Sequence, residues 1–92
     1  MLFELLYFTS PSCTVCHSLR PKLEQMVHDK FPDIRFIPVD IAQQPELSAK
    51  YMVFAAPTMI LLFEESVVYK RSGLFSLIDV ETQFNRIIEL NT

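Results

Sequence analysis

Short apolar runs alternate with stretches of helical periodicity along this chain. Residues 2–8 are almost continuously apolar, which is typical of a central strand buried on both faces. Residues 34–39 and 58–63 predict two further strands, and residues 67–71 predict a fourth. Only a short polar connection separates the last two, so we expect them to form an antiparallel hairpin.

Two long helices and one short helix are expected between and after these strands. Polar residues separate apolar residues at helical spacing between about residues 13 and 30, and again from residue 77 onward. The apolar positions are Leu19, Leu23, Met26 and Val27 in the first helix, and Leu77, Val80, Phe84, Ile87 and Ile88 in the last. The short helix is expected from Pro45 to about Met52, since proline suits a first helical turn.

Prolines and the single glycine refine this outline. Pro38 cannot donate a ladder hydrogen bond, which places its strand at a sheet edge. Pro21 lies inside the first helix and predicts a kink, and Gly73 marks a turn before the last helix. The order β-α-β-α-β-β-α predicts an α/β fold with a four-stranded mixed sheet flanked by helices. Its first β-α-β unit is expected to be parallel and right-handed.

Length, composition and charge exclude several classes of protein. A chain of 92 residues has room for one core, so residues 1–92 are expected to form a single domain. Half of the residues are apolar and 21% are charged, which excludes disorder through low hydrophobicity. The net charge is −3 without a basic block, so we expect no nucleic-acid partner. Residues 1–8 lack the basic start of a signal peptide, and no run is long enough to cross a membrane, which together predict a cytoplasmic protein.

The two cysteines, Cys13 and Cys16, lie where the first strand gives way to the first helix. Residues three apart share a helix face, so the two sulfurs can approach bonding distance. The positive end of the helix favours a thiolate at Cys13, and Cys16 is expected to be less exposed. Cys13 is therefore the expected nucleophile in disulfide exchange and Cys16 the resolving thiol. The alternative is a pair of inert, half-buried cysteines.

His17 follows Cys16 directly and leaves several interpretations open. The pattern C-x-x-C-H is also the attachment signature of c-type haem, although that group needs an exported and mostly helical protein. His17 can also tune the cysteine pair by charge or hydrogen bonding, or it can simply face solvent. Zinc binding by Cys13, Cys16, His17 and His28 is a weak option, because neighbouring side chains on a helix point in different directions. We expect neither a metal nor a bound cofactor.

Several motifs together resemble the thioredoxin family, in the minimal core that it shares with glutaredoxins. They are the apolar strand running into Phe8-Thr9-Ser10-Pro11-Ser12-Cys13-Thr14-Val15-Cys16, Pro21, Val39-Asp40, Ala56-Pro57-Thr58 and Gly73. The resemblance implies a cis proline at Pro57, beside the active cysteines. It also implies that Ala56, Pro57 and Thr58 dock an extended substrate. The alternative for Pro57 is an ordinary proline at the start of a strand.

Some positions depart from the family pattern. Thr14-Val15 replaces the Gly-Pro of thioredoxin, and Ser12 stands where thioredoxin has a tryptophan. With His17, these are candidates for tuning the cysteines. Tyr7 occupies the place of the buried aspartate that assists proton transfer in thioredoxin, and Phe36 replaces the partner lysine. Protons at Cys16 must then be managed by water, by Tyr7 or by another group.

The expected function is that of a protein-disulfide oxidoreductase cycling between dithiol and disulfide. Its expected partners are protein disulfides and an electron donor, either another thiol or a flavoprotein reductase, and we expect a monomer. The alternative is a redox-sensing or binding module with little catalysis. Most aromatic residues are expected in the core, namely Phe3, Tyr7, Phe8, Phe36, Phe54 and Phe63. Met59 and Phe75 are instead candidates for an apolar rim around the cysteines.

Overall fold

The computed structural model describes residues 2–91 and contains every predicted element, with small shifts at the ends. Their order is β-α-β-α-β-β-α, as expected. The elements are β1 (Phe3–Thr9), α1 (Thr14–Lys30), β2 (Ile34–Asp40), α2 (Pro45–Lys50), β3 (Thr58–Phe63), β4 (Ser66–Ser72) and α3 (Leu77–Asn91). Pro21 does lie inside α1, and the kink expected there stays a prediction.

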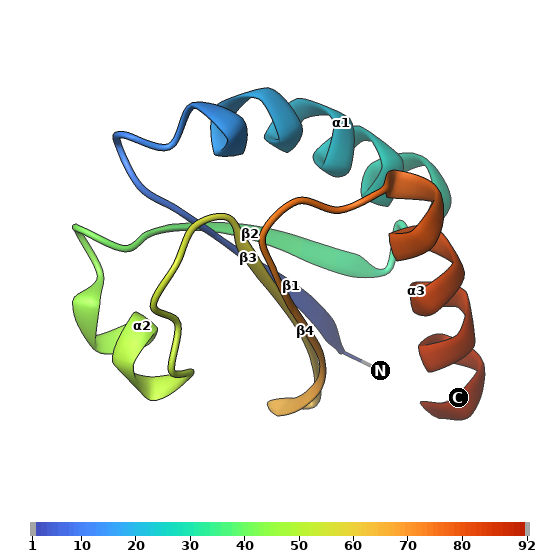
Figure 1. Ribbon diagram of the computed structural model, residues 1–92. Helices are drawn as coiled ribbons and strands as arrows, with labels where there is room; N and C mark the ends of the chain where they lie inside the picture. The colour runs from blue at the N-terminus through green and yellow to red at the C-terminus, as the bar shows by residue number, and fades with distance from the viewer. Residues whose placement is uncertain (1, 92) are drawn as a thin grey trace.

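The four strands form one mixed sheet in the order β2-β1-β3-β4 (Figure 1). β1 pairs with β2 in parallel and with β3 in antiparallel fashion, and β3 and β4 form the expected hairpin. The Pro38 strand is at the edge of the sheet, as predicted. β1, which leads into the cysteine pair, is therefore held by strands on both sides.

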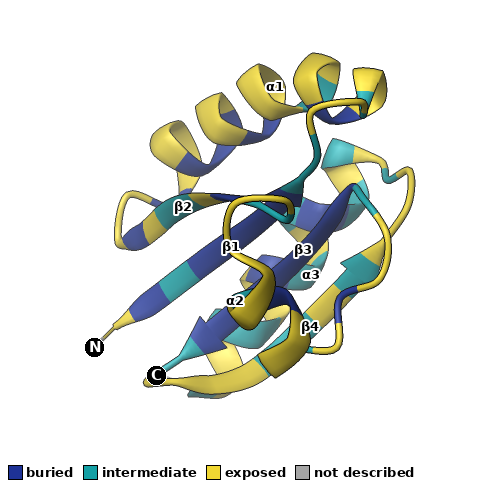
Figure 2. Ribbon diagram, turned by 90° about the vertical axis from the view of Figure 1, so that its left-hand side faces the viewer, coloured by how far each residue is buried: buried dark blue, intermediate teal, exposed yellow. Residues whose placement is uncertain are grey.

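Helices cover both faces of the sheet, with α1 and α3 on one face and α2 on the other (Figure 1). Successive side chains of β1 point to opposite faces, so this strand contributes to two cores. Figure 2 shows the central strands β1 and β3 as the most deeply buried part of the molecule. The larger core lies under α1 and α3 and includes Leu5, Tyr7, Leu23, Leu61 and Phe84. The smaller core lies under α2 and includes Leu6, Phe8, Val39, Val53 and Ile60.

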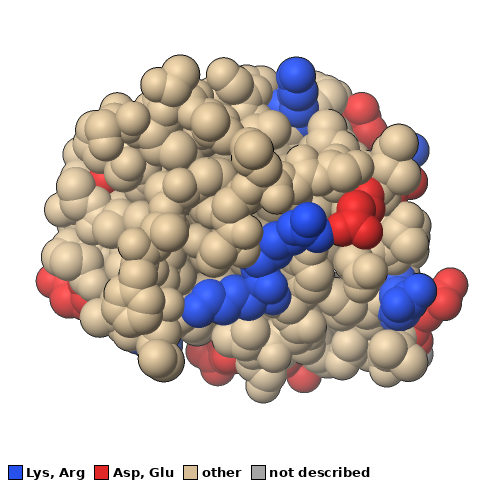
Figure 3. Space-filling view, in the orientation of Figure 1, with Lys and Arg blue, Asp and Glu red and all other residues tan. Residues whose placement is uncertain are grey.

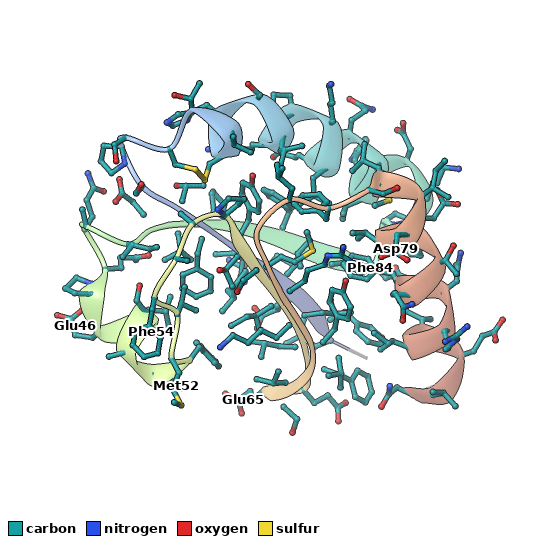
Figure 4. All side chains as sticks on the ribbon, in the orientation of Figure 1. Glu46, Met52, Phe54, Glu65, Asp79 and Phe84 are labelled. Atoms are coloured by element: carbon teal, nitrogen blue, oxygen red, sulfur yellow. A yellow bond between two sulfur atoms is a disulfide. The ribbon has the colours of Figure 1, made fainter. Side chains whose placement is uncertain are left out.

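Two expectations for individual residues were wrong. Phe54 is 85% exposed rather than part of the core, because the loop after α2 turns Val53 inward and Phe54 outward (Figure 4). Met59 is 1% exposed and cannot form a rim, since its position in β3 points into the larger core. Phe75 is half-buried and packs against that same core.

Acidic residues lie at two chain reversals. The carboxylate of Asp40, at the end of β2, accepts a 2.8 Å hydrogen bond from the N–H of Ala42 and so shapes the turn. Glu64 and Glu65 form the exposed tip of the β3–β4 hairpin. Within residues 2–91, none of the helices has the length and apolar character that crossing a bilayer requires.

Candidate active site

Cys13 is the N-cap residue of α1. Its backbone is extended, with φ −88° and ψ 93°, and its Sγ accepts a 3.2 Å hydrogen bond from the N–H of Cys16. The first turn of α1 contains no acidic side chain that would offset the positive end of the helix dipole. The sulfur of Cys13 thus lies where both a backbone donor and the helix dipole stabilise negative charge.

Cys13 and Cys16 are joined by a disulfide, with their Cα atoms 5.3 Å apart (Figure 4). Cys13 is partly exposed, whereas Cys16 is fully buried, which is the difference in exposure expected from the sequence. A sulfur reagent arriving from solvent therefore reaches Cys13 first. Cys16 is accessible chiefly from within the molecule, through its bond to Cys13.

Tyr7 lies directly beneath the first turn of α1. Its hydroxyl donates a 3.0 Å hydrogen bond to the carbonyl oxygen of Cys16, and its side chain is fully buried. The ring of Phe36 lies beside it, with the ring centroids 5.9 Å apart. Burial raises the pKa of the Tyr7 hydroxyl above 10.0, an effect that the positive charge of Arg20 partly offsets, so this hydroxyl keeps its proton at neutral pH. The sequence drew attention to Tyr7 and Phe36, but it gave no sign that the hydroxyl would bind the Cys16 carbonyl.

The loop before β3 brings the three expected docking residues to the end of the sheet from which the chain leaves β1 for the cysteines. Thr58 pairs with Phe8 at the end of β1, just before the chain leaves the sheet for Cys13. The Ala56–Pro57 peptide bond is cis, Pro57 is buried and Ala56 is half-buried. The Thr58 hydroxyl donates a 2.7 Å hydrogen bond to the carbonyl of Ala55, which holds the loop closed.

The candidate tuning residues surround the disulfide without being buried. Ser12, Thr14, Val15 and His17 are all exposed. Among residues 2–91 no three metal-ligating side chains come together. His17 and His28 lie eleven positions apart on α1, or about 16.5 Å at 1.5 Å per residue. That separation leaves the zinc interpretation without a ligand set, and the tuning role of His17 stays a prediction.

The surface around the disulfide is largely uncharged. Residues 7–16, 51–63 and 72–78 contain no Asp, Glu, Lys or Arg. Figure 3 shows a broad region without charged side chains over the end of the molecule where Figure 4 places the disulfide. Exposed apolar side chains in the first and third of these segments include Val15 and Leu74. Such a surface is suited to contact with another polypeptide.

Comparison with known proteins agrees with the fold and the cysteine spacing. A model of the thioredoxin family matches residues 3–85. The chain belongs to the thioredoxin family. This membership, with the CxxC disulfide, supports thiol–disulfide oxidoreductase chemistry in a broad sense.

Relatives and solved structures fit this membership. Thioredoxin-like protein YdfQ of Bacillus subtilis is 26% identical over 88 residues, which cover 96% of this chain and 78% of that protein. Thioredoxin H5 of rice (Oryza sativa subsp. japonica) is 35% identical over 69 residues, covering 75% of this chain but only 50% of that protein. The structure of thioredoxin 1 from Thermosipho africanus superposes with a TM-score of 0.85 at 27% identity, covering 96% of this chain and 97% of that one.

Proposed function

We propose that this protein is a thiol–disulfide oxidoreductase that exchanges its Cys13–Cys16 pair with disulfides of other proteins. One observation carries the proposal. Cys13 caps the helix with its sulfur hydrogen-bonded to a backbone N–H, and it is joined to a fully buried Cys16. This arrangement offers one accessible sulfur for attack and one sheltered sulfur for resolution.

The reaction has two displacement steps. In the reduced protein, the Cys13 thiolate attacks one sulfur of a substrate disulfide. A mixed disulfide forms, and the first substrate thiolate leaves and takes up a proton. Cys16 then loses its proton and attacks the sulfur of Cys13, which closes the Cys13–Cys16 disulfide and releases the second substrate thiolate. Two electrons pass from the protein to the substrate, and the reverse sequence oxidises a dithiol.

Substrate docking is assigned to the segment Ala56-Pro57-Thr58. The half-buried Ala56 is its contact point with the substrate, and Pro57 and Thr58, which are buried, shape the segment from below. The hydrogen bond from the Thr58 hydroxyl to the Ala55 carbonyl supports a fixed shape for this segment. The uncharged surface around it supports a polypeptide as the substrate. Turnover needs a reductant, which we assign to another thiol or to a flavoprotein reductase, and we propose a cytoplasmic monomer.

Two cysteine variants test the proposal in a protein-disulfide reduction assay. Cys13→Ser removes the nucleophile and is expected to abolish reduction. Cys16→Ser leaves the first step intact and is expected to accumulate a covalent complex with the substrate. Ser18→Ala, an exposed change on the same helix, serves as the matched control and should retain full activity. Full activity in Cys13→Ser would refute the assignment.

A second candidate function is a redox-sensing or binding module with slow exchange. In thioredoxin, a buried acid and its lysine partner assist catalysis. Here Tyr7, which keeps its proton at neutral pH, takes the place of the acid, and the Phe36 ring takes the place of the lysine. The loss of both catalytic groups favours the module. Stopped-flow mixing of the reduced protein with a protein disulfide separates the two functions. Rapid exchange with Cys13 already a thiolate at neutral pH supports catalysis, and slow exchange with an ordinary thiol supports the module.

A further inference from the structure

Hydrogen bonds hold the backbone of Cys16 from both sides. On its N-terminal side, the N–H of Cys16 donates to the Sγ of Cys13 at 3.2 Å. On its C-terminal side, the carbonyl oxygen of Cys16 accepts from the hydroxyl of Tyr7 at 3.0 Å. The first contact depends on the state of the cysteine sulfur. The second does not involve sulfur at all.

Tyr7 is itself a rigid donor. It lies in the middle of the central strand β1, paired with Pro38 on one side and Met59 on the other. Its side chain has no exposed surface, and the ring of Phe36 packs against it. A buried hydroxyl that loses its acceptor finds no water to replace it, so this donor has a strong preference for the Cys16 carbonyl.

We propose that Tyr7 is a positioning residue for the resolving step, acting through the Cys16 carbonyl. The inference rests on the proposed disulfide exchange. In the mixed disulfide, the bond between Cys13 and Cys16 is open, and the sulfur of Cys16 must be held in line with the sulfur–sulfur bond that it will break. The Tyr7 hydrogen bond fixes the first turn of α1 to the sheet during this interval. Attack on that bond forms the Cys13–Cys16 disulfide and expels the substrate thiolate, with no change in Tyr7.

The effect of Tyr7 should fall on the second step. Cys13 precedes the helix and is partly exposed, so its sulfur attacks from the solvent side and the first step does not require Cys16 to move. Tyr7→Phe keeps the ring and removes only the hydroxyl. We expect resolution to slow by about fivefold, the equilibrium worth of one ordinary hydrogen bond, while the first attack changes by less than about twofold.

An aromatic disulfide with a coloured thiolate product, dithiobis(nitrobenzoate), resolves the two steps when mixed in equal amount with the reduced protein. One coloured thiolate is released on attack by Cys13 and a second on closure of the Cys13–Cys16 bond. Cys16→Ser shows the first phase alone. Tyr69→Phe is the control, because it removes a hydroxyl from a tyrosine that packs against the same core and whose ring contacts Phe84 of α3. It should leave both phases unchanged.

The outcomes separate this proposal from the function on which it rests. Slowing of the second phase alone in Tyr7→Phe supports the positioning role. Equal slowing of both phases, or equal effects in Tyr7→Phe and Tyr69→Phe, refutes it while leaving the proposed function intact. Absence of either phase in the unaltered protein overturns both.

A measurement on the unaltered protein decides the matter if Tyr7→Phe does not fold. The hydroxyl proton of Tyr7 should be detectable by NMR and protected from solvent exchange in the reduced protein as well as in the disulfide form. Rapid exchange of that proton in the reduced protein would overturn the proposal, because the contact would then be missing when resolution takes place.

Discussion

The backbone N–H of Gly73 donates a 2.8 Å hydrogen bond to the carbonyl oxygen of Pro57. This bond ties the end of β4 to the loop that carries the proposed docking residues. Gly73 has φ +84°, a left-handed conformation in which an L side chain is strained. The glycine at this position is therefore explained by backbone conformation, in a chain that has no other glycine.

Gly73→Ala should destabilise the protein by about 1 kcal/mol, through backbone strain alone. A Cβ at this position would meet no atom within 4 Å, so no steric clash adds to the cost. Gly73→Asn is the control. Asparagine tolerates left-handed conformations better than alanine, so this variant should be less destabilised than Gly73→Ala. Urea unfolding measures both variants. Equal stability of Gly73→Ala and the unaltered protein would contradict this explanation.

Thr58→Val should lower the free energy of unfolding by about 1 kcal/mol. The variant keeps the shape of a residue that is 1% exposed and removes the hydroxyl that bonds to Ala55 and contacts Ser72. Thr82→Val is the matched control. Its hydroxyl also donates to a backbone carbonyl, that of Ile78, but is exposed, so water can replace the contact. A larger loss of unfolding free energy in Thr82→Val than in Thr58→Val would show that burial does not determine how much a lost hydroxyl destabilises the protein.

Tyr7 should make the protein less stable at alkaline pH. Its folded-state pKa is raised above 10.0, so as pH rises past 10.0 the unfolded chain loses the Tyr7 proton first. The folded state then holds more protons than the unfolded state, and stability falls with rising pH. Well below pH 10.0 both states keep the proton and this contribution is constant.

Urea unfolding of the disulfide form at about pH 8 and about pH 11 tests this dependence. The unaltered protein should lose more stability between the two pH values than Tyr7→Phe does. The comparison cancels the ionisation of the other tyrosines and of the lysines, which both proteins share. Identical losses would show that burial does not disfavour the Tyr7 phenolate.

Two phenylalanines at opposite extremes of burial should respond differently to truncation. Phe84 has no exposed surface, and its ring makes edge contacts with Phe31 and Tyr69. Phe84→Ala should cost about 3–5 kcal/mol through lost burial and the remaining cavity. Phe54→Ala, at a residue that is 85% exposed, should change stability by less than about 0.5 kcal/mol. Thermal unfolding measures the loss of stability in both variants. Similar losses in Phe84→Ala and Phe54→Ala would contradict the assignment of Phe84 to the core.

The sequence was sufficient to predict the order of elements because its signals are local. Continuous apolar runs marked β1 and β3, helical spacing marked α1 and α3, and Pro38 identified an edge strand. The helix start at the cysteines was equally predictable, since a polar turn precedes Cys13 and apolar periodicity follows it. These features need no knowledge of distant residues.

Features that depend on tertiary contacts were not predictable in this way. Phe54 is as apolar as any core residue, and only the path of the loop after α2 turns it toward solvent. Met59 is buried by the register of β3 against β1, which a single strand does not specify. The bond from Tyr7 to the Cys16 carbonyl joins residues nine apart across a turn, and no local pattern encodes it.

The central claim is that Cys13 attacks and Cys16 resolves. The most direct measurement mixes the reduced protein with a disulfide-containing protein, quenches with acid at successive times and identifies the products by mass spectrometry. We predict a mixed disulfide at Cys13 that rises and then decays, giving the Cys13–Cys16 disulfide and a reduced substrate in equal amounts. A substrate adduct at Cys16, or loss of substrate disulfide without any adduct at Cys13, would contradict the account.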